Sequence, residues 1–170
     1  SAMERSAACR LAALAVALAA PQARAAPQVL ENPDASAVLA EVNRVRTERG
    51  LSPVKPDPAL MAAASGYAAE LTTRPDLDHI GRDGSTPPVR AEKAGYVGGN
   101  VAENLAAGFA DPTDAVEAWM KSPSHRDVIL KPDAEYAGVA REDAPETEYK
   151  SYWTMLVGGP EKAGGASDVR

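Results

Sequence analysis

Residues 100–130 read N-V-A-E-N-L-A-A-G-F-A-D-P-T-D-A-V-E-A-W-M-K-S-P-S-H-R-D-V-I-L, and the rest of the chain is organised around this stretch. The stretch contains Glu103 and His125. The only other histidine of the sequence, His79, lies upstream. Each histidine stands beside turn residues rather than inside an apolar run. We therefore predict that Glu103 and the two histidines converge on one cleft.

Two helices are predicted within this stretch. Asp111 followed by Pro112 is typical of an N-cap and a first helical residue, so a helix is expected from there to about Lys121. Trp119 falls on the apolar face of this helix and is expected in the core rather than in a ligand site. A shorter helical segment is predicted over residues 122–130.

Apolar residues recur at helical spacing in two segments further upstream. The first helix is predicted over residues 35–49, with Asp34 as its N-cap and Gly50 as its C-terminal stop. The second helix is predicted over residues 58–71, with Asp57 as its N-cap. The linker between the two helices is rich in proline and is expected to be extended.

The remaining elements are a loop, a short helix and strands. A loop is predicted over residues 72–88 and a short helix over residues 88–93. Residues 101–107 are too short for periodicity to separate a strand from a helical turn. Strands over 136–140 and 149–157 are expected to form a hairpin with an acidic tip. Helices followed by strands indicate an α+β fold rather than a parallel βαβ sheet.

Residues 3–25 are typical of a secretory signal peptide, and Ser1 and Ala2 before Met3 are typical of the remnant of an expression tag. A basic start leads into an unbroken apolar run over residues 11–20, and an A-x-A cleavage site ends at Ala25. This run is shorter than the roughly 20 apolar residues that span a bilayer. The alternative is an N-terminal anchor that is retained. With cleavage, we expect a secreted or periplasmic protein that is not stably inserted in a membrane.

Three further segments are expected after the signal peptide: a leader over residues 26–33, one domain over 34–158, and a disordered tail over 159–170. The single cysteine, Cys9, lies in the segment that would be removed, so the domain has to rely on packing rather than on disulfides. The formal net charge of −6 argues against a nucleic acid or an anionic membrane as partner. We expect a monomer.

The two histidines and Glu103 allow more than one chemistry. A convergent pair of histidines with a carboxylate matches a site for Zn²⁺ or another divalent cation that keeps an open coordination position. The same residues without a metal could work as a general acid and base. They could also be hydrogen-bonded structural residues. Spacing alone does not decide between these interpretations, because His79 and His125 are far apart in the sequence and no H-E-x-x-H element is present.

Two further polar residues are candidates for the same site. Ser122 lies three residues before His125 and could face the same way on a helix, although a serine before a proline is more typical of an N-cap. No G-x-S-x-G element supports a serine hydrolase. Asn104 follows Glu103 directly, and a buried asparagine at that position would most simply tie down backbone groups. We retain Ser122 and Asn104 as candidate ligand-binding residues.

Five segments, taken in order, resemble the CAP superfamily of cysteine-rich secretory proteins, antigen 5 and pathogenesis-related proteins, and are similar to its bacterial, secreted, cysteine-free branch. They are V-L-A-E-V-N-R-V-R-T-E-R-G-L from residue 38, D-H-I-G-R-D-G from residue 78, A-G-Y-V-G-G-N-V-A-E-N-L-A-A-G from residue 94, A-V-E-A-W-M-K-S-P-S-H-R-D-V-I-L from residue 115, and Y-A-G-V-A with Y-W-T-M-L-V-G near the end.

The resemblance implies a three-layer α–β–α sandwich around a small antiparallel sheet, with an open cleft. It places His79, Glu103 and His125 at the metal-binding positions of that cleft. Ser122 stands where the eukaryotic branch has a second glutamate, which puts a four-residue site in doubt. The resemblance also implies binding of a divalent cation, and of a small molecule or a lipid. The alternatives are a structural or protein-interaction domain with a vestigial cleft, and a metal- or histidine-dependent extracellular hydrolase.

Overall fold

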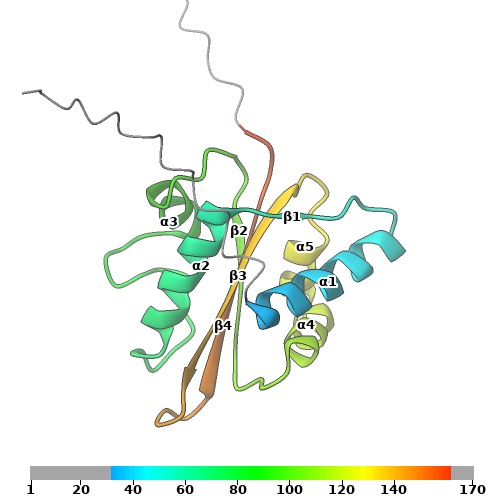
Figure 1. The fold of residues 1–170 in the computed structure, drawn as a ribbon. Coiled ribbons are helices and arrows are strands. Elements are labelled where there is room, and N and C mark those ends of the chain that lie inside the picture. The colour runs from blue at the N-terminus through cyan, green and yellow to red at the C-terminus, as the bar shows by residue number, and fades with distance from the viewer. Residues whose placement is uncertain (1–31, 162–170) are drawn as a thin grey trace, which may run out of the picture.

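The computed structural model describes residues 32–161, which form helices packed on both sides of a four-stranded sheet (Figure 1). The helices are α1 (Pro33–Glu48), α2 (Pro58–Leu71), α3 (Pro87–Lys93), α4 (Pro112–Lys121) and α5 (Pro123–Ile129). The strands are β1 (Lys55–Pro56), β2 (Ala102–Ala107), β3 (Tyr136–Ala144) and β4 (Lys150–Gly158). The predicted signal peptide lies outside the described residues, as do most of the leader and residues 162–170.

The sheet has the strand order β1-β3-β4-β2 and is mixed rather than purely antiparallel. Strands β3 and β4 form the predicted hairpin, and β2 pairs antiparallel with β4. The two-residue strand β1 runs parallel to β3, so the expectation of an all-antiparallel sheet was wrong. A strand this short carries no periodicity. Its proline has no N–H to donate, which confines β1 to the edge of the sheet.

The helices form a layer on each face of the sheet, which confirms the predicted α–β–α sandwich (Figure 1). On one face, α2 and α3 pack against side chains such as Leu156 and Tyr152. On the other face, α1, α4 and α5 pack against Trp153 and Met155. Trp119 lies in the core between the sheet and α1, α4 and α5. It is fully buried, as its place on the helix predicted.

Each of the first two helices begins with a polar residue followed by proline. For α2 the predicted N-cap Asp57 is confirmed. For α1 the N-cap is Asn32, whose side chain accepts hydrogen bonds from the backbone N–H groups of Asp34 and Ala35. The prediction of Asp34 was therefore two positions late, because the Asn-Pro pair has the same role as the later Asp-Pro pairs. Gly50 ends α1 as predicted, with a positive φ of 73°.

The later part of the chain differs from the predictions, or goes beyond them, in three places. Residues 102–107 are a strand, which settles the ambiguity that periodicity left open. Strand β3 continues beyond the expected end at residue 140 to Ala144, whereas β4 begins at Lys150, one residue later than expected. Residues 159–161 are not a disordered tail. The backbone N–H of Gly159 donates to the carbonyl of Gly99 at 2.8 Å, and Glu161 forms a β-bridge with Gly98. Among the described helices, none is long and apolar enough to cross a bilayer.

Candidate functional site

Strand β2 places two neighbouring polar side chains on opposite faces of the sheet. Successive side chains of a strand alternate between faces, so Glu103 points toward α2 and α3 while Asn104 points toward α5. Glu103 meets His79 from the loop after α2, and Asn104 meets the backbone of His125 in α5. One edge strand therefore links the two segments that carry the histidines.

The first half of the site is an ion pair between a surface histidine and a buried carboxylate. The His79 Nδ1 lies 2.9 Å from Oε1 of Glu103. The His79 side chain is 48% exposed, whereas that of Glu103 is 1% exposed. The hydrogen bond to Glu103 raises the pKa of His79 above its ordinary value, against the opposing effect of burial. Because Nδ1 is engaged with Glu103, the Nε2 of the ring is the nitrogen left to contact a ligand.

The second carboxylate oxygen of Glu103 is held by Arg90, a residue of α3. The Nη2 of Arg90 donates to Oε2 of Glu103 at 2.6 Å. The Nη1 of the same guanidinium donates to the backbone carbonyls of His79 at 3.0 Å and Ser85 at 2.8 Å. The guanidinium also lies 3.5 Å from the ring centre of Tyr67. Both oxygens of Glu103 are thus occupied, and its charge is balanced by a buried arginine.

The loop that carries His79 is fixed through consecutive backbone carbonyls. The hydroxyl of Tyr67 donates to the carbonyl of Asp78, Arg90 donates to that of His79, and Arg74 donates to that of Ile80 at 2.7 Å. These three donors lie outside the segment that they hold. The position of the imidazole is therefore set by the backbone as well as by Glu103, so the side chain does not have to be ordered when a ligand binds.

The second half of the site is His125 at the start of α5. Asn104 donates from Nδ2 to the backbone carbonyl of His125 at 2.8 Å, and the ring itself has no hydrogen-bond partner within residues 32–161. Burial lowers the pKa of His125, and the charge on His79 lowers it further. Both effects favour the neutral form of the His125 imidazole.

Ser122 and Asn104, the predicted ligand-binding residues, are placed differently from the histidines. Ser122 occupies the N-cap position of α5 but makes no capping hydrogen bond. Its hydroxyl lies 3.4 Å from that of Ser124. Among the described residues, Ser122 makes no hydrogen bond to either imidazole. It therefore does not form a nucleophile–base pair with a histidine. Asn104 is fully buried and ties down backbone, as its sequence position suggested.

The donors at this site fit a two-histidine arrangement better than a three-ligand one. Within residues 32–161, no group of three or more His, Cys, Asp or Glu side chains is arranged to hold a metal ion. Glu103 is committed to Arg90 and His79. The two groups that a cation could bind are the free Nε2 of His79 and the ring of His125. Glu103 would support the first of these ligands through its hydrogen bond to Nδ1 of His79.

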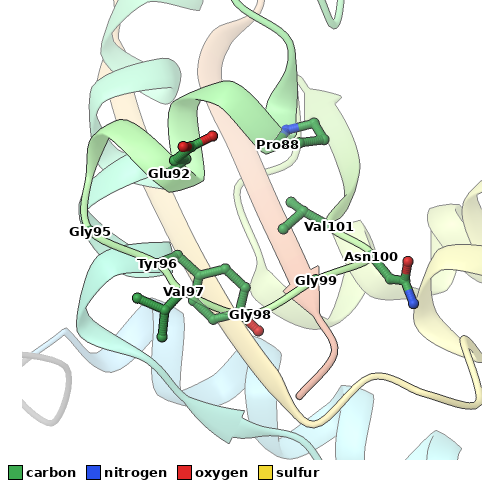
Figure 2. A pocket seen from close by; sticks show the side chains of 9 residues that line it. All are labelled: Pro88, Glu92, Gly95, Tyr96, Val97, Gly98, Gly99, Asn100 and Val101. Carbon is green, nitrogen blue, oxygen red and sulfur yellow. The ribbon is translucent and has the colours of Figure 1, made fainter. Parts of the chain in front are cut away.

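A separate pocket lies nearby but contains none of the predicted site residues. It has a volume of about 590 Å³ and is lined by Pro88, Glu92 and the residues from Gly95 to Val101. Figure 2 shows this lining, with the Tyr96 ring and the Val97 side chain beside the glycine-rich turn that leads into β2. Neither histidine reaches this pocket.

The residues that hold the site together could not be recognised in the sequence. Arg90, Tyr67 and Arg74 all contact the His79 loop, yet each appeared in the sequence as an ordinary member or neighbour of a helix. No sequence pattern marked Arg90, because its partner Glu103 lies on another element.

Comparison with known proteins agrees with this architecture. Residues 39–157 match the cysteine-rich secretory protein family, CAP. The Bacillus subtilis protein YkwD is 29% identical over 118 residues, which is 69% of this chain and 44% of YkwD. The membrane protein YlbC of the same organism is 26% identical over 60% of this chain and 30% of its own length. The chain therefore spans less than half of each of these relatives.

Solved structures show the same fold. An outer surface protein of Borrelia burgdorferi superposes with a TM-score of 0.68 at 26% identity, over 76% of this chain and 93% of that one. An extracellular Bacillus anthracis protein containing an SCP domain gives a TM-score of 0.66 at 19% identity, over 76% of this chain and 44% of that one. With a family match over most of its described residues and this fold, the chain belongs to the cysteine-rich secretory protein (CAP) family.

Proposed function

We propose that this protein is an extracellular binding domain that holds a divalent cation, with Zn²⁺ as the first candidate, between His79 and His125. The observation that carries the proposal is the hydrogen bond between His79 Nδ1 and the buried carboxylate of Glu103. Histidines that bind metals almost always donate their second ring nitrogen to a carboxylate, a carbonyl or water. That bond selects the tautomer and leaves Nε2 as the ligand atom.

The state of His125 also supports a cation site. A metal ligand has to be the neutral imidazole, and the lowered pKa of His125 favours the neutral form near pH 7. Its ring is free of hydrogen bonds within residues 32–161, so no bond would have to be broken on binding. A bound Zn²⁺ would act there as a Lewis acid with open coordination positions. His79 and His125 would hold it, and Glu103 would orient His79.

An extracellular location is supported by the relatives and by the start of the sequence. One solved relative is an outer surface protein and another is an extracellular protein. Residues 1–25 have the pattern of a secretory signal peptide. The predicted binding of a lipid stays a prediction, because no contact within residues 32–161 favours it over other small ligands.

The experiment that tests the proposal is Zn²⁺ titration calorimetry at about pH 7.5, where unperturbed histidines are mostly neutral. The wild-type protein is compared with His79→Ala and His125→Ala. We expect saturable one-site binding that each substitution removes. Two protein ligands are one fewer than in most catalytic zinc sites, so the binding should be weak and reversible. Absence of binding in the wild-type protein would contradict the proposal and favour an interaction domain.

A matched control separates the loss of a ligand from the loss of the fold. Arg126 is exposed on α5 next to His125, and its side chain makes no hydrogen bond among the described residues. Arg126→Ala should therefore retain Zn²⁺ binding within a small factor. If Arg126→Ala abolished binding as completely as His125→Ala, the effect would come from α5 as a whole rather than from the imidazole.

A further inference from the structure

We infer that Arg90 determines which cations the site accepts, because it holds Glu103 in an ion pair and so keeps this carboxylate from becoming a ligand. The inference rests on the proposed cation site and assigns its specificity. Arg90 is not a ligand of the proposed cation. It acts through Glu103, so it is a positioning residue.

The geometry shows that Glu103 is not free to turn toward a ligand. One oxygen accepts from His79 at 2.9 Å and the other from Arg90 at 2.6 Å. The side chain is 1% exposed. A carboxylate that coordinated a cation would have to give up at least one of these bonds, and a charged hydrogen bond of this kind is among the stronger ones in proteins.

Arg90 is itself anchored at several points, so the ion pair is a fixed part of the fold. Its guanidinium donates to the carbonyls of His79 and Ser85 and stacks on Tyr67. Its side chain is only 10% exposed. An exposed arginine could swing away from Glu103 at little cost. This one would give up its bonds to two carbonyls and leave that of His79 without a donor, which opposes any movement.

The charge balance leads to the same conclusion. A buried carboxylate needs a nearby positive charge, and removing one partner of a buried pair is strongly unfavourable. Arg90 supplies that charge to Glu103. Without Arg90, a bound cation could supply it instead and would gain Glu103 as a ligand. Arg90 and a cation therefore compete for the same carboxylate.

This competition has a direct consequence for specificity. Imidazole suits Zn²⁺, Cu²⁺, Ni²⁺ and Co²⁺, whereas carboxylate oxygens suit Mg²⁺, Ca²⁺ and Mn²⁺. With Glu103 withheld, the protein side chains at the site offer nitrogen from His79 and His125. The wild-type site should discriminate strongly against the cations that prefer oxygen ligands, and Arg90 is the residue responsible.

The test compares Zn²⁺ and Mn²⁺ binding by the full chain in the wild-type, Arg90→Met, Arg90→Lys and Arg90→Met/Glu103→Gln proteins, each first shown to be folded by circular dichroism. In Arg90→Met we expect Mn²⁺ affinity to rise by about tenfold or more relative to Zn²⁺ affinity, because Glu103 becomes available as an oxygen ligand. The double variant should lose that gain. Arg90→Lys keeps a positive charge beside Glu103 and should retain the wild-type preference.

The inference is overturned if Arg90→Met is folded and its preference between Mn²⁺ and Zn²⁺ is unchanged, since a purely structural arginine would alter both affinities alike. If Arg90→Met does not fold, the Co²⁺ absorption spectrum of Glu103→Gln gives the answer. An unchanged band pattern, with affinity lower by about 10–100-fold, shows that Glu103 is not a ligand in the wild-type protein. A changed band pattern shows that it is a ligand and contradicts the inference.

Failure of the proposed function would be recognised separately. If the wild-type protein binds no Zn²⁺, the proposed function fails. Arg90→Met would then still report on Arg90, because a gain of cation binding that Glu103→Gln removes shows that the arginine was withholding the carboxylate. No gain in a folded Arg90→Met protein would show that it was not.

Discussion

Asn104 joins the edge strand β2 to helix α5 by donating a hydrogen bond from its side chain to the backbone carbonyl of His125 at 2.8 Å. The preceding residue, Glu103, holds His79 on the other face of the same strand. Two adjacent residues thus position the two histidines of the chain, and the alternation of side chains along a strand is what makes this arrangement possible.

The Asn104 bond predicts an effect on binding without loss of a ligand. Asn104→Ala removes the side-chain hydrogen bond that ties β2 to the backbone carbonyl of His125, which should reduce the free energy of unfolding by about 0.5–1.5 kcal/mol. Zn²⁺ affinity should fall by about 10–100-fold, as for other groups that support metal ligands. Urea denaturation and calorimetry measure the two effects.

Thr154→Val is the matched control for this change. The hydroxyl of Thr154 is also fully buried on the sheet, and it has no hydrogen-bond partner among residues 32–161. Its loss should leave both stability and Zn²⁺ binding close to the wild-type values. If Asn104→Ala also left Zn²⁺ affinity unchanged, the strand would not be what positions His125.

The pKa values of the two histidines should be shifted in opposite directions from the ordinary value. Glu103 raises the pKa of His79, whereas burial and the charge on His79 lower the pKa of His125. An NMR titration of the imidazole resonances should therefore give a higher pKa for His79. In His79→Gln the pKa of His125 should rise, because the repelling charge is gone. A fall, or no change, would show that the rings do not interact.

The same shifts predict how His79 affects stability at different pH values. Because the folded-state pKa of His79 is raised, its proton stabilises the fold below the unfolded pKa of about 6.5, and this contribution is lost as the pH rises through the folded pKa. The stability difference between wild type and His79→Gln should therefore be larger at about pH 5.5 than at about pH 8. It should stay under about 1 kcal/mol, because His79 is half exposed and solvent screens the pair. Urea denaturation at both pH values measures it, and a larger difference at the higher pH would contradict the assignment.

Arg46 should be the most sensitive charged residue for stability. It is fully buried and donates to the carbonyls of four other residues, Ser52, Ile129, Lys131 and Ala134. Arg46→Met removes all of these bonds and leaves the carbonyls of Ser52, Ile129 and Ala134 without a donor among the described residues, which should cost about 3–5 kcal/mol in urea denaturation. Arg44→Met, which removes two ion pairs from the surface of the same helix, should cost less than about 1 kcal/mol. Equal costs would contradict the assigned role of Arg46.

Two glycine substitutions, one beside α2 and one within it, should change the stability of the protein in opposite directions. A Cβ on Gly138 would lie 2.1 Å from the backbone carbon of Leu60, so Gly138→Ala should push α2 off the sheet and destabilise the protein by about 1–3 kcal/mol. A Cβ on Gly66, within α2, meets nothing within 4 Å. Gly66→Ala should stabilise the protein by about 0.4–1 kcal/mol. Thermal unfolding distinguishes the two, and a destabilised Gly66→Ala would show that α2 packs differently.

Much of the fold could be predicted because its signals are local. Helix α2 follows from its apolar spacing and from Asp57, which lies directly before it. The two-residue strand β1 could not be predicted, because its only determinant is the partner strand β3. Likewise the histidines stood out by residue type, but Arg90 did not. Its partner Glu103 lies 13 positions away on another element, and no residue pattern marks such a pair.

The most direct test of the central claim is a long-range ¹H–¹⁵N NMR spectrum of the imidazole nitrogens, recorded as Zn²⁺ is added to one equivalent. The chain has only two histidines, so each ring can be followed without ambiguity. We predict that Nε2 of His79 and one nitrogen of His125 shift together, while Nδ1 of His79 stays protonated against Glu103. A shift of only one ring, or of neither, would contradict the claim that the two histidines form one cation site.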